Sequence, residues 1–174
     1  MSLHDKVIMI MVEKEYQILE VWYPLMRFRE EGANIHVVGS GSSNKYKSTH
    51  GYSITVSANA SEVAASDYDA VIVPGGWAPD YIRRHQDMVT LVREVHEYGG
   101  IVGTSSHGGS ILVSSGLAQG ARLTSFSSIR DDLVSAGAIW VDEPVVVHNR
   151  IVTCQSYSEL PEFVKHIIEE IKKT

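Results

Sequence analysis

Residues 101–109 read Ile-Val-Gly-Thr-Ser-Ser-His-Gly-Gly, a short apolar segment that leads directly into a polar turn rich in glycine. The apolar part, Ile101–Thr104, predicts a buried strand, and a helix is expected over Gly109–Ser115. A sharp strand-to-helix turn lifts its central side chain above the end of the sheet, as in a nucleophile elbow. The side chain placed there is Ser106, with His107 beside it.

Apolar strand-like segments alternate with helical patterns along the rest of the chain. Lys6–Val12 predicts a strand buried on both faces, and Glu15–Glu31 has apolar residues at helical spacing, with Pro24 predicting a kink or a break. This alternation predicts an α/β fold, with a mainly parallel central sheet and helices on both faces. Further strands are expected at Asn34–Val38, Ser53–Val56, Ala70–Val73, Arg122–Thr124, Val145–His148 and Ile151–Cys154, further helices at Ser61–Ala65, Met88–Val95, Ile129–Ala136 and Val164–Ile171, and a loop at Gly39–Lys47.

Composition limits the class of protein. The 174 residues, 44% apolar and 21% charged, fit one globular domain spanning 1–174. A formal charge of −6 argues against nucleic-acid and anionic-membrane surfaces. The longest apolar run, Val7–Val12, is far too short to span a bilayer, and no leader pattern is seen, so we expect a cytoplasmic protein. The single cysteine, Cys154, can form no internal disulfide and fits a reducing compartment.

Ligands in parallel α/β folds lie beyond the carboxyl ends of the strands, which marks five candidate site segments. Metal-binding motifs are weak: His96-Glu97 begins a metalloprotease-like pattern, but Gly100 occupies the place of the second histidine. We therefore expect no metal and no cofactor. The five segments are Val12–Glu15, Gly39–Gly41, Pro74–Trp77, Ser105–Gly108 and Cys154–Tyr157.

The turn at Ser106 has two interpretations from the residues alone. The helix that follows supplies free N–H groups and a positive potential, which favour an anion at the turn. However, Thr104 stands where the strict elbow pattern requires glycine, and serines and glycines also serve simply to cap helices. Both interpretations stay open at this point.

Several further segments together resemble the ThiJ/PfpI family, which includes PfpI-type intracellular proteases and general stress proteins. The resemblance covers nearly the whole chain and implies a flavodoxin-like three-layer sandwich related to class I glutamine amidotransferases. It also implies homodimers, or hexamers built from them. The segments that carry it are Glu15–Gln17 with Tyr23-Pro24, Lys47–Tyr52, Val71–Asp80, Ser106–Gly108, Ser125 with Ile129–Leu133, and Ala136–Ala138 with Trp140–Asp142.

The resemblance also implies a set of site residues. The family's nucleophilic cysteine maps to Ser106 and its histidine to His107, while the glutamate that hydrogen-bonds the cysteine maps to Gln17. A third catalytic acid, supplied by a neighbouring subunit, maps to Asp80. The expected ligand-binding residues are Gly75, Gly76, Trp77 and Gly108, with an oxyanion site formed by the amides of His107 and of Gly75 or Gly76.

Two departures from the family pattern change the expected chemistry. A serine hydroxyl is not ionised near neutral pH and needs a base, and it cannot undergo cysteine oxidation. Gln17 is a neutral hydrogen-bond donor that cannot transfer a proton. We therefore expect cysteine peptidase and redox-sensing chemistry to be lost, leaving a stress-related protein or one that binds a small carbonyl, carboxylate, amide or peptide ligand. The alternative is a serine hydrolase or amidase that uses Ser106, His107 and a neighbouring subunit's Asp80. Cys154 is either a replacement thiol or a buried strand residue.

Overall fold

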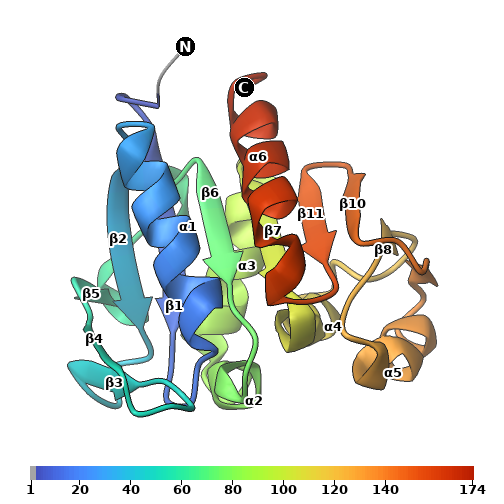
Figure 1. Cartoon of the computed structure of the whole chain (residues 1–174), viewed down its shortest axis with the longest axis horizontal. Coiled ribbons are helices and arrows are strands. Elements are labelled where there is room, and N and C mark those ends of the chain that lie inside the picture. The colour runs from blue at the N-terminus through green and yellow to red at the C-terminus, as the bar shows by residue number, and fades with distance from the viewer. Residues whose placement is uncertain (1–2) are drawn as a thin grey trace.

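A seven-stranded sheet organises the protein, in the order β10-β11-β7-β6-β1-β2-β5. The computed structural model describes residues 3–174 (Figure 1). All neighbouring strands in this sheet are parallel except β10 and β11, which form an antiparallel edge. The predicted α/β fold with a mainly parallel sheet is confirmed.

The strands and helices have the following bounds. The sheet contains β1 (Val7–Val12), β2 (Asn34–Gly39), β5 (Ala58–Asn59), β6 (Ala70–Val73), β7 (Ile101–Ser105), β10 (Val145–His148) and β11 (Ile151–Cys154). Two small ribbons pair β3 (Lys45–Lys47) with β4 (Ser53–Thr55), and β8 (Arg122–Leu123) with β9 (Ile139–Trp140). The α-helices are α1 (Ile18–Glu30), α2 (Ala78–Ile82), α3 (Gln86–Glu97), α4 (Ser110–Ser114), α5 (Arg130–Ser135) and α6 (Leu160–Ile171). The 3₁₀ turns are η1 (Ala60–Glu62), η2 (Ala65–Asp67), η3 (Ser106–Gly109), η4 (Ser127–Ile129) and η5 (Tyr157–Glu159).

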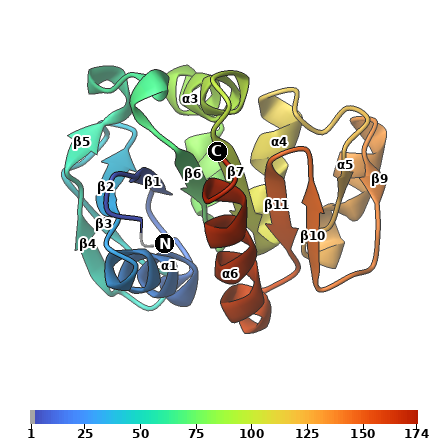
Figure 2. The same ribbon diagram turned by 90° about the horizontal axis from the view of Figure 1, so that it is seen from above.

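The helices form a layer on each side of the sheet. Seen from above, α1 and α6 lie on one face, and α3 and α4 lie on the other (Figure 2). The arrowheads of β2 and β6 point to the end of the molecule where α2 lies (Figure 1), and β1 runs parallel to both. Loops at this end therefore meet in space although they are distant in sequence. Among residues 3–174, no helix combines the length and apolar character needed to cross a bilayer.

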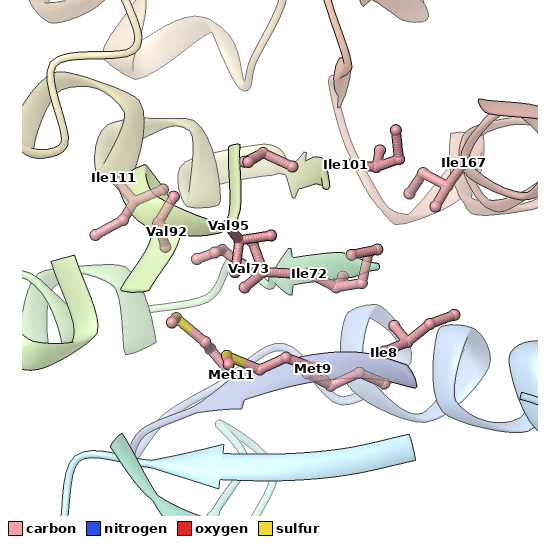
Figure 3. Close-up of a cluster of buried hydrophobic side chains, with 14 of the residues drawn as sticks. Ile8, Met9, Met11, Ile72, Val73, Val92, Val95, Ile101, Ile111 and Ile167 are labelled. Carbon is pink, nitrogen blue, oxygen red and sulfur yellow. The ribbon is translucent and has the colours of Figure 1, made fainter. Parts of the chain in front are cut away.

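Side chains from both helical layers fill the core against the central strands (Figure 3). Val92 and Val95 of α3 are fully buried on one side, and Ile167 of α6 is fully buried on the other. The absence of a side chain at Gly103 lets α6 approach the sheet, because a Cβ there would lie 2.7 Å from Ile167 Cδ1 and 3.1 Å from Phe163 Cζ. Close packing of this kind makes the core sensitive to lost volume.

Three local expectations differ from the structure. The break, one of the two outcomes expected at Pro24, does not occur, because the buried face of α1, with Val21 and Phe28, holds the helix against the sheet. The helix expected at Ser61–Ala65 is replaced by the 3₁₀ turns η1 and η2, with Val63 extended between them. The loop expected at Gly39–Lys47 ends in β3, because its partner β4 supplies the hydrogen bonds that a short isolated strand lacks.

Shortening Ile167 to alanine should destabilise the fold by about 2–5 kcal/mol, because the change removes buried methylenes and leaves a cavity between α6 and the sheet. Urea unfolding followed by circular dichroism measures the effect. The matched control is Ile139→Ala, at an isoleucine that is 59% exposed, where the change should stay within about 0.5 kcal/mol. Equal losses in the two variants would contradict this account of the core.

Candidate active site

Ser106 lies at the turn between β7 and α4, with a backbone φ of +53°. This left-handed conformation is uncommon for residues other than glycine and is often found at functional turns. Neighbouring backbone closes around the turn: a Cβ on Gly108 would lie 2.4 Å from Val73 O, and one on Gly75 would lie 2.9 Å from Ser106 Cβ. Ser106 therefore occupies a constrained elbow, with its side chain largely buried. Gly108, predicted to bind ligand, has a packing role here.

His107 faces the hydroxyl of Ser106. Its Nδ1 lies 3.3 Å from Ser106 Oγ, and its Nε2 lies 3.0 Å from Ser128 Oγ. These contacts fit a tautomer in which Nε2–H donates to Ser128 and Nδ1 accepts from Ser106. The ring stacks on Phe126 with centroids 4.8 Å apart. Burial lowers the pKa of His107 below its ordinary value, so the imidazole is neutral at pH 7 and can accept a proton.

A buried carboxyl group lies directly beneath the elbow. Glu20 of α1 is 1% exposed, and its Oε2 accepts hydrogen bonds from Gly75 N at 2.5 Å and Ser105 Oγ at 2.7 Å. Burial raises the pKa of Glu20, and the charge of Glu159 adds to this, against the opposing effect of the two hydrogen bonds. Sequence reasoning missed this residue. The available signal was an acidic side chain on the apolar face of a helix, one residue before Val21.

Gln17, predicted to stand beside the elbow residue, has a different role. It is the N-cap of α1, and its Oε1 accepts a hydrogen bond from Glu20 N at 3.0 Å. Capping one of the free N–H groups of the first helical turn takes up the side-chain oxygen. A carboxyl nevertheless lies beneath the elbow, that of Glu20, and it bonds to Gly75 N and Ser105 Oγ, with no hydrogen bond to Ser106 among residues 3–174.

A pocket of about 160 Å³ opens next to the elbow. Trp77, Asp80 and Arg83 line it together with His107, so the structure brings α2 and its two caps to one cavity with the elbow. Asp80 is exposed on α2 and pairs with Arg84 of its own chain, and no hydrogen bond joins it to His107 among residues 3–174. Its predicted action on a neighbouring subunit stays a prediction.

Of the three amides predicted to hold an oxyanion, that of Gly75 is already hydrogen-bonded within the protein. Gly75 N donates to Glu20 and points below the elbow, so Gly75 contributes no ligand contact through its amide. Gly76 has φ +71°, and a Cβ there would lie 2.5 Å from Glu15 O, so the chain turns tightly at this point. The candidate donors toward the pocket are therefore the amides of Gly76 and His107.

Cys154 lies behind the elbow and outside the pocket. It pairs in register with Ser105 at the end of β11 and is fully buried. Burial raises the pKa of the thiol well above its ordinary value, and the charges of Glu20 and Glu159 raise it further. A thiol held neutral is a poor nucleophile. The interpretation of Cys154 as a buried strand residue is confirmed.

Replacing Glu20 with glutamine tests whether the buried carboxyl is protonated in the folded protein. The pKa of Glu20 is raised in the folded state, so the native protein retains a proton that the unfolded chain releases above pH 4.5. Glu20 should therefore contribute a loss of stability as the pH rises from 4.5, whereas His107, whose pKa is lowered, contributes in the opposite direction. The free energy of unfolding of the wild type minus that of Glu20→Gln should fall over this range. The glutamine oxygen can accept both hydrogen bonds, so the variant should be at least as stable as the wild type at pH 7.

Urea unfolding between pH 4.5 and pH 8 measures this effect. The control is Glu94→Gln, at a half-buried glutamate of α3, which should keep the pH dependence of the wild type. A wild-type advantage over Glu20→Gln that grows with pH would show that Glu20 is ionised in the native state.

Comparisons with known proteins agree with this architecture. The sequence profile described as the DJ-1/PfpI family matches residues 6–170. A deglycase of Thermococcus kodakarensis is 36% identical over 162 residues, covering 91% of this chain and 97% of its own. The deglycase PfpI of Pyrococcus furiosus is 32% identical over 165 residues, covering 95% and 99%.

Solved structures extend the comparison. A two-domain protein of Anabaena variabilis, with DJ-1/ThiJ/PfpI-like and ferritin-like domains, superposes with a TM-score of 0.93 at 32% identity, covering 96% of this chain and 48% of that one. Drosophila melanogaster DJ-1beta superposes with a TM-score of 0.88 at 22% identity, covering 99% and 95%, and shares the fold. The resemblance seen in the sequence is thereby confirmed: the chain belongs to the DJ-1/PfpI family.

Proposed function

We propose that the elbow pocket binds a small ligand carrying a carbonyl or carboxylate group, without the covalent chemistry that a cysteine at position 106 would provide. The observation that carries this proposal is the environment of His107. The Nε2 of His107 lies 3.0 Å from the Ser128 hydroxyl. In a catalytic triad a carboxylate occupies the position of this hydroxyl. The two side chains that contact the His107 ring nitrogens, Ser106 and Ser128, are thus neutral hydrogen-bonding groups.

Turnover at Ser106 would require His107 to become positively charged. Burial already disfavours that form, as the lowered pKa of His107 indicates. In serine proteases, removal of the orienting aspartate lowers kcat by about 10⁴. Since the hydroxyl of Ser128 cannot stabilise an imidazolium as an aspartate does, binding is favoured over rapid hydrolysis.

The groups around the pocket fit a carbonyl or carboxylate oxygen. The amides of Gly76 and His107 are donors, and Arg83 and Asp80 place one charge of each sign in the lining. The Ser106 hydroxyl lies beside the pocket, 3.3 Å from His107 Nδ1. Trp77 supplies an aromatic wall. The name deglycase, borne by several relatives, also favours a carbonyl-derived ligand for this chain.

Pyruvate, which carries both a carbonyl and a carboxylate, is a suitable probe, and ligand-observed NMR titration measures its affinity. Ser106→Ala should weaken binding about fivefold to tenfold, the loss typical of one hydrogen bond. The control Ser61→Ala, at an exposed serine of η1, should bind as the wild type does. Equal affinities of the wild type and Ser106→Ala would refute the assignment of the ligand to the elbow.

The second candidate function is a serine hydrolase or amidase, favoured by the 3.3 Å contact between Ser106 Oγ and His107 Nδ1 and by the strained φ of Ser106. In this mechanism Ser106 attacks, His107 accepts its proton, and Asp80 of a neighbouring subunit supplies the missing carboxylate.

A fluorophosphonate probe separates the two candidates. Under the binding proposal, intact-protein mass spectrometry should detect no adduct after incubation between about pH 5 and pH 9, because Ser106 lacks an adequately supported base. An adduct that is absent from both Ser106→Ala and Asp80→Asn would instead establish the hydrolase. A serine protease treated in parallel serves as the positive control for the reagent.

A further inference from the structure

A second and larger cavity, of about 560 Å³, lies on the other side of α2 from the elbow pocket. It sits beyond the carboxyl ends of β1 and β2, a position where parallel α/β folds commonly hold ligands. Lys14, Lys45, Lys47, Arg84 and His85 line it. This concentration of basic residues occurs in a chain whose formal charge is −6.

The three lysines of this basic cavity have no acidic partner. Among residues 3–174, no carboxylate oxygen lies within 4.0 Å of the ammonium group of Lys14, Lys45 or Lys47. Arg84 is paired, but its partner Asp80 lines the elbow pocket. Positive charges gathered around one cavity repel one another, and an anion bound between them relieves that repulsion.

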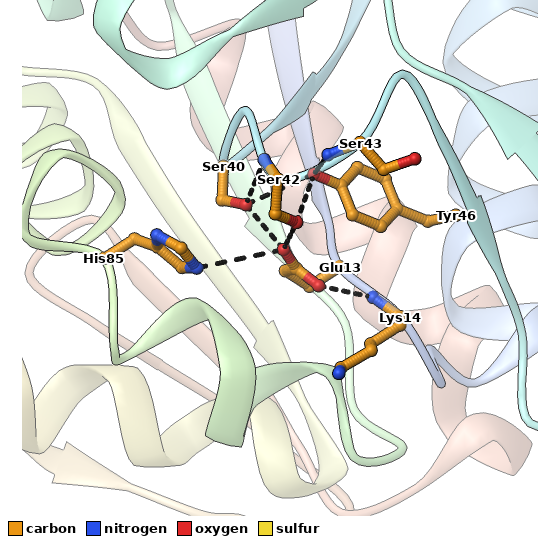
Figure 4. Close-up of polar contacts among 7 residues, drawn as sticks. All are labelled: Glu13, Lys14, Ser40, Ser42, Ser43, Tyr46 and His85. Atoms are coloured by element: carbon orange, nitrogen blue, oxygen red, sulfur yellow. Dashed lines mark hydrogen bonds and ion pairs between the residues drawn. The ribbon is translucent and has the colours of Figure 1, made fainter.

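The one carboxylate that lines the basic cavity, Glu13, offsets part of the positive charge but forms no ion pair with the lysines, because hydroxyl and amide donors occupy its oxygens. Glu13 is 2% exposed, and its Oε1 accepts from Ser40 Oγ at 2.5 Å and Ser42 Oγ at 2.6 Å. Its Oε2 accepts from Lys14 N at 2.8 Å (Figure 4). Burial would raise the pKa of Glu13, but these hydrogen bonds and the nearby His85 lower it overall. Glu13 thus fixes the cavity floor as a structural anion.

The ring of Tyr81 contacts two of the cations. The Nζ of Lys14 lies 4.3 Å from the ring centroid of Tyr81, and the guanidinium carbon of Arg84 lies 4.7 Å from the same centroid. On β3, the exposed Lys45 and Lys47 flank the buried Tyr46, so strand alternation places both lysines on one face. The arrangement exists before any ligand arrives, which reduces the ordering cost of binding.

We propose that this basic cavity binds a small phosphorylated molecule. Lysine ammonium groups bind phosphate as compact point charges, and several of them together match the double negative charge of a phosphate monoester better than the single charge of a carboxylate. The volume is in the range of small-molecule sites and exceeds that of a phosphate group alone. The ring of Tyr81 offers a surface for the organic part of the ligand.

Isothermal titration of the full chain at constant ionic strength tests the proposal, with glycerol 3-phosphate and inorganic phosphate as probes. Both should bind, whereas glycerol and acetate should not. Lys45→Ala/Lys47→Ala should weaken glycerol 3-phosphate binding at least about tenfold. The control Lys165→Ala/Lys173→Ala removes the same charge from the region of α6 and should leave the affinity unchanged.

Three outcomes would overturn the proposal: binding of neither phosphate probe, equal weakening in the two double variants, or equal binding of acetate. Both altered lysines of β3 are exposed, so the variant should fold, and circular dichroism verifies this. Ser106→Ala should bind glycerol 3-phosphate as the wild type does, so this result stands apart from the function proposed for the elbow.

Discussion

The fold of the elbow depends on the buried carboxyl of Glu20. One oxygen of this group accepts from the amide after β6 and from the hydroxyl at the end of β7, so a single side chain of α1 joins three segments of the chain. A Cβ on Gly75 would lie 2.6 Å from that oxygen, so the joint also requires glycine. Burying a carboxyl is costly without partners, and these two donors offset much of the cost. The conformation of Ser106 is thereby fixed from below, by a group that faces no ligand.

The sequence predicted the sheet and its two helical layers well, but it did not predict the buried Glu20 beneath the elbow. β1, β6 and β7 are buried on both faces, and such strands appear as continuous apolar runs that are easy to recognise. The two-residue strands β5 and β9 and the five-residue helix α2 are too short to show a periodicity, so they were missed. Each of them forms because longer neighbours hold its backbone in place.

The error over Gln17 and Glu20 has a physical origin. Both residues lie in the first turns of α1, where a polar side chain can cap the helix or point into the protein. Which residue caps the helix and which points into the protein depends on how α1 packs against the loop after β6. That packing is set by contacts between residues far apart in the sequence. Capping suits Gln17 at the helix start, and the approach of Gly75 N selects Glu20 for the interior.

The position of α2 has a consequence for both cavities. This helix forms a wall shared between them, and its Asp80 pairs with Arg84, so one ion pair has an end in each cavity. An anion bound in the basic cavity would compete with Asp80 for the guanidinium of Arg84. The Asp80 carboxylate would then be unpaired and available to a ligand in the elbow pocket. Thermodynamic linkage makes the effect reciprocal: a cationic ligand that engages Asp80 would release Arg84 and strengthen anion binding on the far side. The Asp80–Arg84 ion pair is thus the direct contact through which occupancy of one cavity would be felt in the other, with no change of fold required.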